Sequence, residues 1–142
     1  MEENYFKKFR EIEVSNFVER KGNLTYLSWA KAWDLLKQQD PDASFEIHEK
    51  DGIPYFTDGK WVWVKVTVHA MGHCHTCILP VMNHMNKALT IETVDMNLIN
   101  KSIMRCLTKA TAMHGIGLSL YIGEDLPSEN TNHSNKTFVI HK

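Results

Sequence analysis

The stretch Lys60-Trp61-Val62-Trp63-Val64-Lys65-Val66-Thr67-Val68-His69 alternates between valine and larger or more polar side chains. Successive side chains of a β-strand point to opposite faces, so this alternation predicts a strand with an apolar face made of valines. The opposite face carries two tryptophans, a lysine, a threonine and a histidine. This is the most definite strand in the chain, and its valines are expected to lie in the core.

Turn signals on both sides of this strand predict antiparallel neighbours. Asp51-Gly52 and Asp58-Gly59 favour the tight turns of β-hairpins, and Gly72 marks a further turn. The strands expected beside 60–69 are Ser44–Glu49, Ile53–Thr57 and His73–Val81.

A helix is predicted before the strands. Ser28 is suited to cap it, and Asp40-Pro41-Asp42 stops it after about Gln39, because proline cannot continue helical hydrogen bonding. The residues before Ser28 show no firm period, so their secondary structure stays open. The apolar face of this helix is expected to consist of Trp29, Ala32, Trp33 and Leu36.

A longer helix is predicted after the strands, from a cap near Thr90 or Thr93 to about His114. Gly115 lies where such a helix should end, because glycine readily adopts the left-handed conformation found there. The segment Leu118–Ile122 predicts a short final strand.

The order of helix, antiparallel strands and long helix predicts an α+β fold. We expect a three- to four-stranded antiparallel sheet packed by a long C-terminal helix and a shorter N-terminal helix, a β-β-β-α core. A chain of 142 residues fits one domain, which we place at residues 1–127. The tail 128–142, rich in Ser, Asn, Thr and His, is expected to be disordered.

The overall composition is that of a globular protein, with 43% hydrophobic and 23% charged residues. The net charge is −1, from 16 basic and 17 acidic residues, so a nucleic-acid partner requires basic residues clustered locally. No transmembrane span is expected, because no apolar run reaches about eighteen residues. The N-terminus lacks a secretory pattern, and the odd count of 3 cysteines indicates reduced thiols, so a cytoplasmic location is predicted.

A basic row is predicted on the long helix, where Lys101, Arg105 and Lys109 repeat at every fourth position. At about 100° per residue the row centres roughly 150° from the apolar side, so it should be exposed. Asn97 lies one turn further back on the same line. Such a row is suited to follow a phosphate backbone, and the alternative is an ordinary solvated helix face. The apolar side itself consists of Ile99, Ile103, Leu107 and Ala110.

A second candidate DNA surface is the polar face of 60–69, where Trp61 and Trp63 lie beside Lys65. Aromatic rings beside cations suit a single strand, because every base has a π-face on which rings can stack. In the alternative, the tryptophans cover a second small core or a subunit interface, where tryptophan is enriched. Both interpretations hold together if subunits form a ring with its groove at the interface.

The segment His73-Cys74-His75-Thr76-Cys77 contains potential metal ligands. Zinc needs about four ligands in a tetrahedral array, and Cys106 with His114 or His84 is the only further supply. On a strand, Cys74 and Cys77 project to opposite faces, which opposes shared ligation. We therefore predict no metal site and no cofactor.

Catalytic motifs are scarce. The chain has no G-x-x-x-x-G-K-[ST] loop, which argues against an ATP-driven recombinase, and no G-x-S-x-G. Carboxylates suited to Mg²⁺ in a nuclease are Glu92, Asp95, Glu124 and Asp125. However, Asp95 suits the start of the long helix, and Glu124-Asp125 an exposed turn before Pro127. We expect no enzymatic activity, with a metal-dependent nuclease as the less favoured alternative.

Several segments, taken in order, agree with one known family in residues and spacing. They are Tyr26-Leu27-Ser28-Trp29-Ala30-Lys31-Ala32-Trp33, Leu79-Pro80-Val81-Met82 with Asn86-Lys87-Ala88, Asn100–Ala110, His114–Leu118 and Gly123-Glu124-Asp125-Leu126-Pro127. On these segments the chain resembles a phage and prophage family of single-strand annealing proteins, which is similar to a distant branch of the Rad-fifty-two superfamily. The resemblance runs from about Phe9 to Pro127.

The resemblance implies ATP-independent binding of single-stranded DNA and annealing of complementary strands in phage recombination and repair, in the cytoplasm of a bacterial host. It also implies homo-oligomeric rings or arcs with a positively charged groove. In the superfamily, basic residues of the long helix line the inner DNA site, and the matching positions are Lys101, Arg105 and Lys109. Lys65 is a weaker match, on the central strand.

Two departures from the family accompany this resemblance. Asn83 stands where family members carry an acidic residue, which puts the role of its loop in question. The tail is short, whereas the longer tails of relatives are suited to recruit a host single-strand-binding protein. A regulatory or interaction protein that kept the fold and lost DNA binding is the alternative function, and the near-neutral charge keeps this alternative open.

Overall fold

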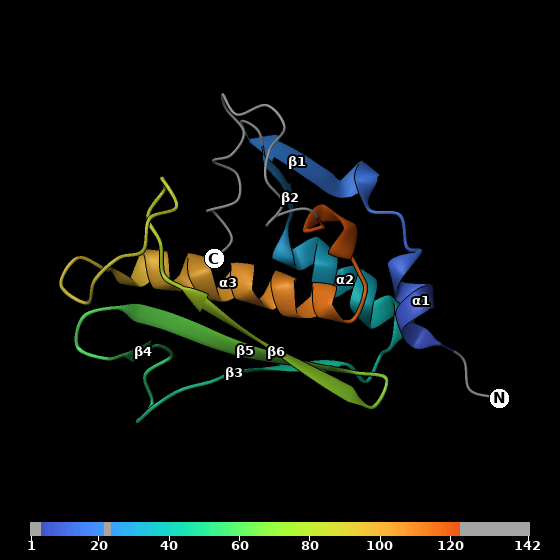
Figure 1. Ribbon diagram of the computed structural model, residues 1–142. Helices are drawn as coiled ribbons and strands as arrows, with labels where there is room; N and C mark the ends of the chain where they lie inside the picture. The colour runs from blue at the N-terminus through green and yellow to red at the C-terminus, as the bar shows by residue number, and fades with distance from the viewer. Residues whose placement is uncertain (1–3, 22–23, 123–142) are drawn as a thin grey trace.

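The valine-rich strand lies at the centre of a four-stranded antiparallel sheet in the computed structural model, which describes residues 4–21 and 24–122. The predicted tail at 128–142 lies outside the described residues. Figure 1 shows helix α3 between this sheet and a separate two-stranded hairpin. The elements are α1 (Tyr5–Arg10), η1 (Ser15–Phe17), β1 (Val18–Lys21), β2 (Leu24–Leu27), α2 (Trp29–Gln39), β3 (Ser44–Ile47), β4 (Phe56–Thr57), β5 (Val62–Ala70), β6 (His73–Pro80), α3 (Met96–Met113) and η2 (Leu118–Leu120).

Strand β5 organises the sheet by pairing with β3, β4 and β6. The β5–β6 hairpin closes through Met71 and Gly72, whose φ angles of 53° and 78° are those of the tight turn that suits the twist of antiparallel strands. Strand β4 is shorter than the predicted Ile53–Thr57, because Ile53 pairs with Lys50 across the preceding turn. The predicted antiparallel α+β fold is confirmed.

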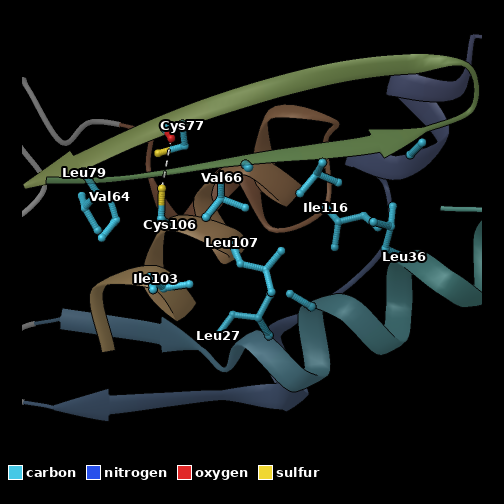
Figure 2. Packing of buried hydrophobic residues seen from close by; sticks show 14 of the residues in the cluster. Leu27, Leu36, Val64, Val66, Cys77, Leu79, Ile103, Cys106, Leu107 and Ile116 are labelled. Carbon is cyan, nitrogen blue, oxygen red and sulfur yellow. Dashed lines mark hydrogen bonds between the residues drawn. The ribbon is translucent and has the colours of Figure 1, made fainter. Parts of the chain in front are cut away.

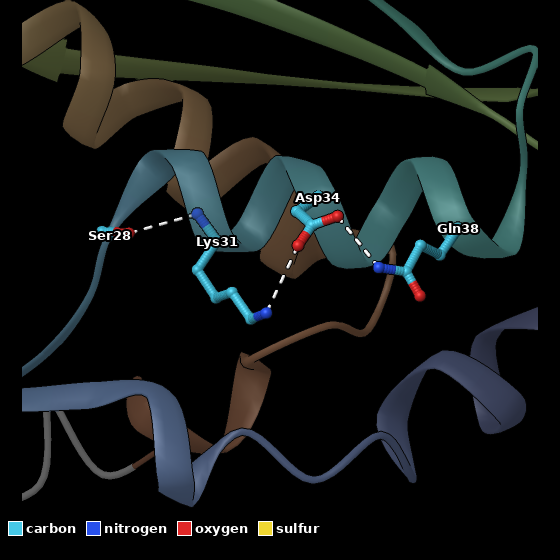
Figure 3. Close-up of polar contacts among 4 residues, drawn as sticks. All are labelled: Ser28, Lys31, Asp34 and Gln38. Carbon is cyan, nitrogen blue, oxygen red and sulfur yellow. Dashed lines mark hydrogen bonds and ion pairs between the residues drawn. The ribbon is translucent and has the colours of Figure 1, made fainter.

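Helix α2 begins and ends as predicted. The Ser28 hydroxyl accepts a 3.1 Å hydrogen bond from the Lys31 amide at its start. On its outer side the Asp34 carboxylate accepts bonds from the Lys31 ammonium at 3.3 Å and the Gln38 amide at 2.9 Å (Figure 3). Ala32 and Leu36 are buried as expected, whereas Trp29 is exposed because the first turn of α2 borders the groove described below.

Helix α3 begins later than predicted. Asp95 is its N-cap, and its carboxylate accepts a 2.9 Å hydrogen bond from the Leu98 amide. The expected cap at Thr90 or Thr93 is wrong. Thr90 pairs with Trp61 beside the sheet, and the single turn that follows, in which the Thr93 and Val94 amides donate to the Thr90 carbonyl oxygen, is not continued as a helix.

The end of α3 is where the sequence placed it, but the chain beyond it is not a strand. His114 is the C-cap, and Gly115 follows with φ 125°. The segment predicted as a strand at 118–122 instead forms η2, whose amides bond to carbonyls three residues earlier. Gly117, with φ 78°, turns the backbone into this tight 3₁₀ geometry.

The core lies where α3 packs on the valine face of β5 (Figure 2). All four valines are at most 1% exposed, and the predicted apolar side of α3 is buried as well. The N-terminal region, for which the sequence showed no period, adds Phe9 of α1 and Leu27 of β2 to the same core. No helix within residues 4–21 and 24–122 has the length and apolar character that a membrane crossing requires.

Candidate nucleic-acid interface

A groove of about 620 Å³ runs along the side of α3 that faces the hairpin and the start of α2. The α3 residues that line it are Leu98, Asn100, Lys101, Ser102, Met104, Arg105 and Thr108. One wall consists of Glu19, Tyr26, Leu27, Ser28 and Trp29. The other wall is the loop after β6, with Met82, Asn83, His84 and Asn86. A smaller cavity of about 50 Å³ continues beyond Arg105 towards Lys109 and Tyr121.

The predicted basic row follows this groove. Lys101 lines the larger cavity, Lys109 the smaller one, and Arg105 both. Lys101 is exposed as expected, but Arg105 and Lys109 are partly buried, because residues of β2 and the segment after α3 pack beside them. The Lys109 ammonium lies 5.4 Å from the centroid of the Tyr121 ring, which favours a cation there.

The groove is locally basic on a chain of net charge −1. Among the described residues, the side chains of fixed charge that line the two cavities are Lys101, Arg105, Lys109 and Glu19. Three cations therefore face one carboxylate in a concave surface, where field lines concentrate. Such a surface attracts a polyanion although the whole protein does not carry a basic excess.

Asn83 stabilises the loop after β6, which forms one wall of the groove. Its side-chain oxygen accepts hydrogen bonds from the amides of Met85 at 2.8 Å and Lys87 at 3.1 Å. Asn86 takes a left-handed conformation with φ 62°, which completes the tight turn. An asparagine oxygen accepts these bonds without the negative charge that a carboxylate would place beside the groove. Asn83 therefore orders the loop without adding a negative charge beside the groove.

The second candidate surface lies elsewhere in the chain. Trp63 and Lys65 alternate along β5 with buried valines, so they face away from α3. Trp63 stacks on Phe56 with ring centroids 6.4 Å apart, and the Lys60 ammonium lies 4.9 Å from the Trp61 ring. None of Trp61, Trp63 and Lys65 lines the groove, and neither does Asn97, which is exposed. The structure thus places the basic row along the groove and the smaller cavity beside it, and leaves these four residues outside both.

Sequence reasoning missed two aromatic residues of the groove. Tyr26, on β2, lines both cavities, and no period in the N-terminal region indicated the hairpin that holds it. Trp29 was assigned to the apolar face of α2, whereas it lines the larger cavity with 42% of its surface exposed. The Ser28 cap could have indicated this position of Trp29. A residue directly after the cap lies in the first turn, at the end of the helix, where the helix is less covered by the core.

The sequence offers cysteines and carboxylates as possible metal ligands. Cys74 is exposed and Cys77 is buried, as their opposite directions on β6 predicted. The Cys106 thiol donates to the carbonyl oxygen of Cys77 at 3.1 Å. Across residues 4–21 and 24–122, no group of three or more His, Cys, Asp or Glu side chains is placed to hold a metal ion. Glu124 and Asp125 lie outside the described residues.

Comparison with known proteins identifies one family. The sequence model of the Sak single strand annealing proteins matches residues 4–139, which is nearly the whole chain. No curated protein and no solved structure matches significantly.

Proposed function

Because the chain belongs to the Sak single strand annealing protein family, we propose that it binds single-stranded DNA in the groove along α3 and anneals complementary strands without ATP. The observation that carries this proposal is the placement of Lys101, Arg105 and Lys109 in one concave surface. Phosphate contacts of this kind are independent of sequence, as annealing of arbitrary strands requires.

Annealing by this groove needs no covalent step and no cofactor. The cations hold the phosphate backbone of one strand and reduce its repulsion from a second strand. Bases that are left unpaired along the groove remain able to test a complementary strand. The chemistry is therefore that of binding and positioning, carried by the side chains of α3.

The length of the basic row supports an oligomer. Lys101 and Lys109 are eight positions apart, which corresponds to about 12 Å along the helix axis. Stacked nucleotides advance about 3.4 Å each, so one chain contacts about three or four of them. A duplex that persists needs more base pairs, and we propose that several copies form a ring or arc with continuous grooves. In this setting the protein acts in phage recombination in the bacterial cytoplasm, with a host single-strand-binding protein as a further partner.

The test is an annealing assay with labelled complementary oligonucleotides, at low and high salt and with or without magnesium. Accelerated pairing of intact strands without magnesium supports the proposal. A variant with Lys101, Arg105 and Lys109 changed to Ala should lose the acceleration. The matched control changes Lys50, Lys60 and Lys87 to Ala. These substitutions remove the same positive charge at exposed positions that do not line the groove.

Two other outcomes would replace the proposal. If the wild-type protein binds no single strand even at low salt, a regulatory or interaction role on this fold is the better assignment, as the net charge of −1 favours. If the strands are shortened in the presence of magnesium, the protein is a nuclease.

A further inference from the structure

Trp29 is the tryptophan least engaged by the rest of the chain. The chain has 4 tryptophans, and each of the other three makes a ring or cation contact: Trp33 with Phe45, Trp61 with Lys60, and Trp63 with Phe56. Within the described residues, Trp29 makes no such contact and is not part of the core cluster. A large aromatic ring left half-exposed in a cavity is suited to an external partner.

The position of Trp29 is fixed by local structure. It is the first residue of α2, directly after the Ser28 cap, whose hydroxyl accepts from the Lys31 amide. The backbone that carries the ring is therefore held by the helix. The ring lines the same cavity of about 620 Å³ as Lys101 and Arg105, so an aromatic surface and two cations face one space.

We propose that Trp29 forms a base-stacking subsite beside the phosphate-binding row, and that its ligand is an unpaired nucleobase. This inference rests on the proposed DNA binding by the groove and adds a contact that cations cannot make. A strand whose phosphates lie along α3 can turn its bases towards a side wall of the groove, and Trp29 lies in the wall formed by the hairpin and the start of α2. Stacking on an indole is tolerant of base identity, as an annealing protein needs.

The subsite gives the groove a preference for single strands. In a duplex, each base is already stacked and paired, so it cannot reach Trp29 without being unpaired. The basic row alone attracts single and double strands through the same phosphates. Trp29 therefore favours single-stranded over double-stranded DNA. Its removal should reduce the ratio of the two affinities more than it reduces the salt dependence of binding.

The experiment compares the full-length wild type with Trp29→Ala and Trp29→Phe on two probes, a thymidine oligonucleotide and an abasic strand of equal length. Trp29→Ala should weaken binding of the thymidine strand about 5- to 140-fold, the range expected for loss of one stacked base. It should leave binding of the abasic strand unchanged, and Trp29→Phe should retain most of the affinity. The matched control is Trp61→Ala, because Trp61 is equally exposed at 42% and lies outside the groove.

The outcomes separate this inference from the proposed function. If the wild type binds neither probe, the DNA-binding proposal and the subsite both fail. If the wild type binds both probes and Trp29→Ala binds the thymidine strand as tightly, the subsite alone is refuted. Equal weakening on both probes would show a structural effect of Trp29 and also overturn the assignment. The same loss in Trp61→Ala would place the stacking surface on the outer face of the sheet.

Discussion

The hydroxyl of Tyr5 lies 3.1 Å from Nδ1 of His114, at the opposite end of the described chain. On the other side of the same ring, Nε2 lies 2.8 Å from the carbonyl oxygen of Val68. A carbonyl oxygen only accepts, so Nε2 carries the proton and Nδ1 accepts from the Tyr5 hydroxyl. The neutral ring thereby joins α1, β5 and the end of α3 in a fully buried position.

This buried histidine predicts a loss of stability in acid. Burial lowers the pKa of His114 below the ordinary value of 6.5, and the nearby His75, His73 and His69 lower it further, against the opposing effect of the Val68 bond. The unfolded chain then binds a proton at a pH where the native ring does not. The neutral His114 ring contributes fully to the free energy of unfolding above the pKa that this histidine has in the unfolded chain. As the pH falls below that pKa, the free energy of unfolding decreases by at most about 1.4 kcal/mol per pH unit.

Urea unfolding at a series of pH values measures this slope. His114→Gln should be less stable at neutral pH and should lose part of the slope, because the titrating ring is gone. His84→Gln makes the same substitution at an exposed position of the 82–86 loop and is the matched control. An unaltered slope in His114→Gln would refute the assignment.

The basic row predicts a salt dependence that falls with each cation removed. Affinity for a single strand should decline with salt with a slope of about −0.7 per phosphate contact on logarithmic axes. Arg105→Ala should weaken binding and reduce this slope by about one contact. Lys50→Ala, in an exposed turn beyond the sheet, should change neither. Equal slopes for wild type and Arg105→Ala would place the phosphates elsewhere.

The three cysteines are predicted to differ sharply in reactivity. The neighbouring Cys77 thiol and burial both raise the pKa of Cys106, so its reactive thiolate is scarce, whereas Cys74 is exposed. A thiol reagent should label one cysteine rapidly in the native protein and all 3 in denaturant. Cys74→Ser should abolish the rapid phase. Rapid native labelling of Cys106, mapped by mass spectrometry, would contradict the buried pair.

Gly115 is predicted to be intolerant of a side chain. Its φ is +125°, and a Cβ there would lie 2.8 Å from the Cβ of Phe9 and 2.9 Å from the carbonyl oxygen of Phe6. Gly115→Ala should therefore reduce the free energy of unfolding by about 2–5 kcal/mol, through backbone strain and displacement of α1. Gly72→Ala is the control, because its φ is also positive but nothing lies within 4 Å, so only the strain of about 1 kcal/mol remains. Thermal unfolding compares the two, and equal losses would contradict a close contact between α1 and Gly115.

Local sequence patterns were sufficient to predict the central sheet, the two main helices and the basic row. Each depends on a period of a few residues: the valines of β5 recur at every second position, and the cations of α3 at every fourth. Backbone geometry alone sets those directions, so no distant contact was needed to predict them. The start of α3 was predicted wrongly because Thr90 pairs with Trp61, which is distant in the sequence.

Contacts between distant segments determine which surface the basic row belongs to. The groove has walls from β2, the first turn of α2 and the loop after β6, which are far from α3 in the chain. Trp29 and Trp61 have the same exposed fraction, and packing alone places one in the groove that Arg105 lines and the other outside it. A cavity is a relationship among distant segments, and local periodicity carries no information about it.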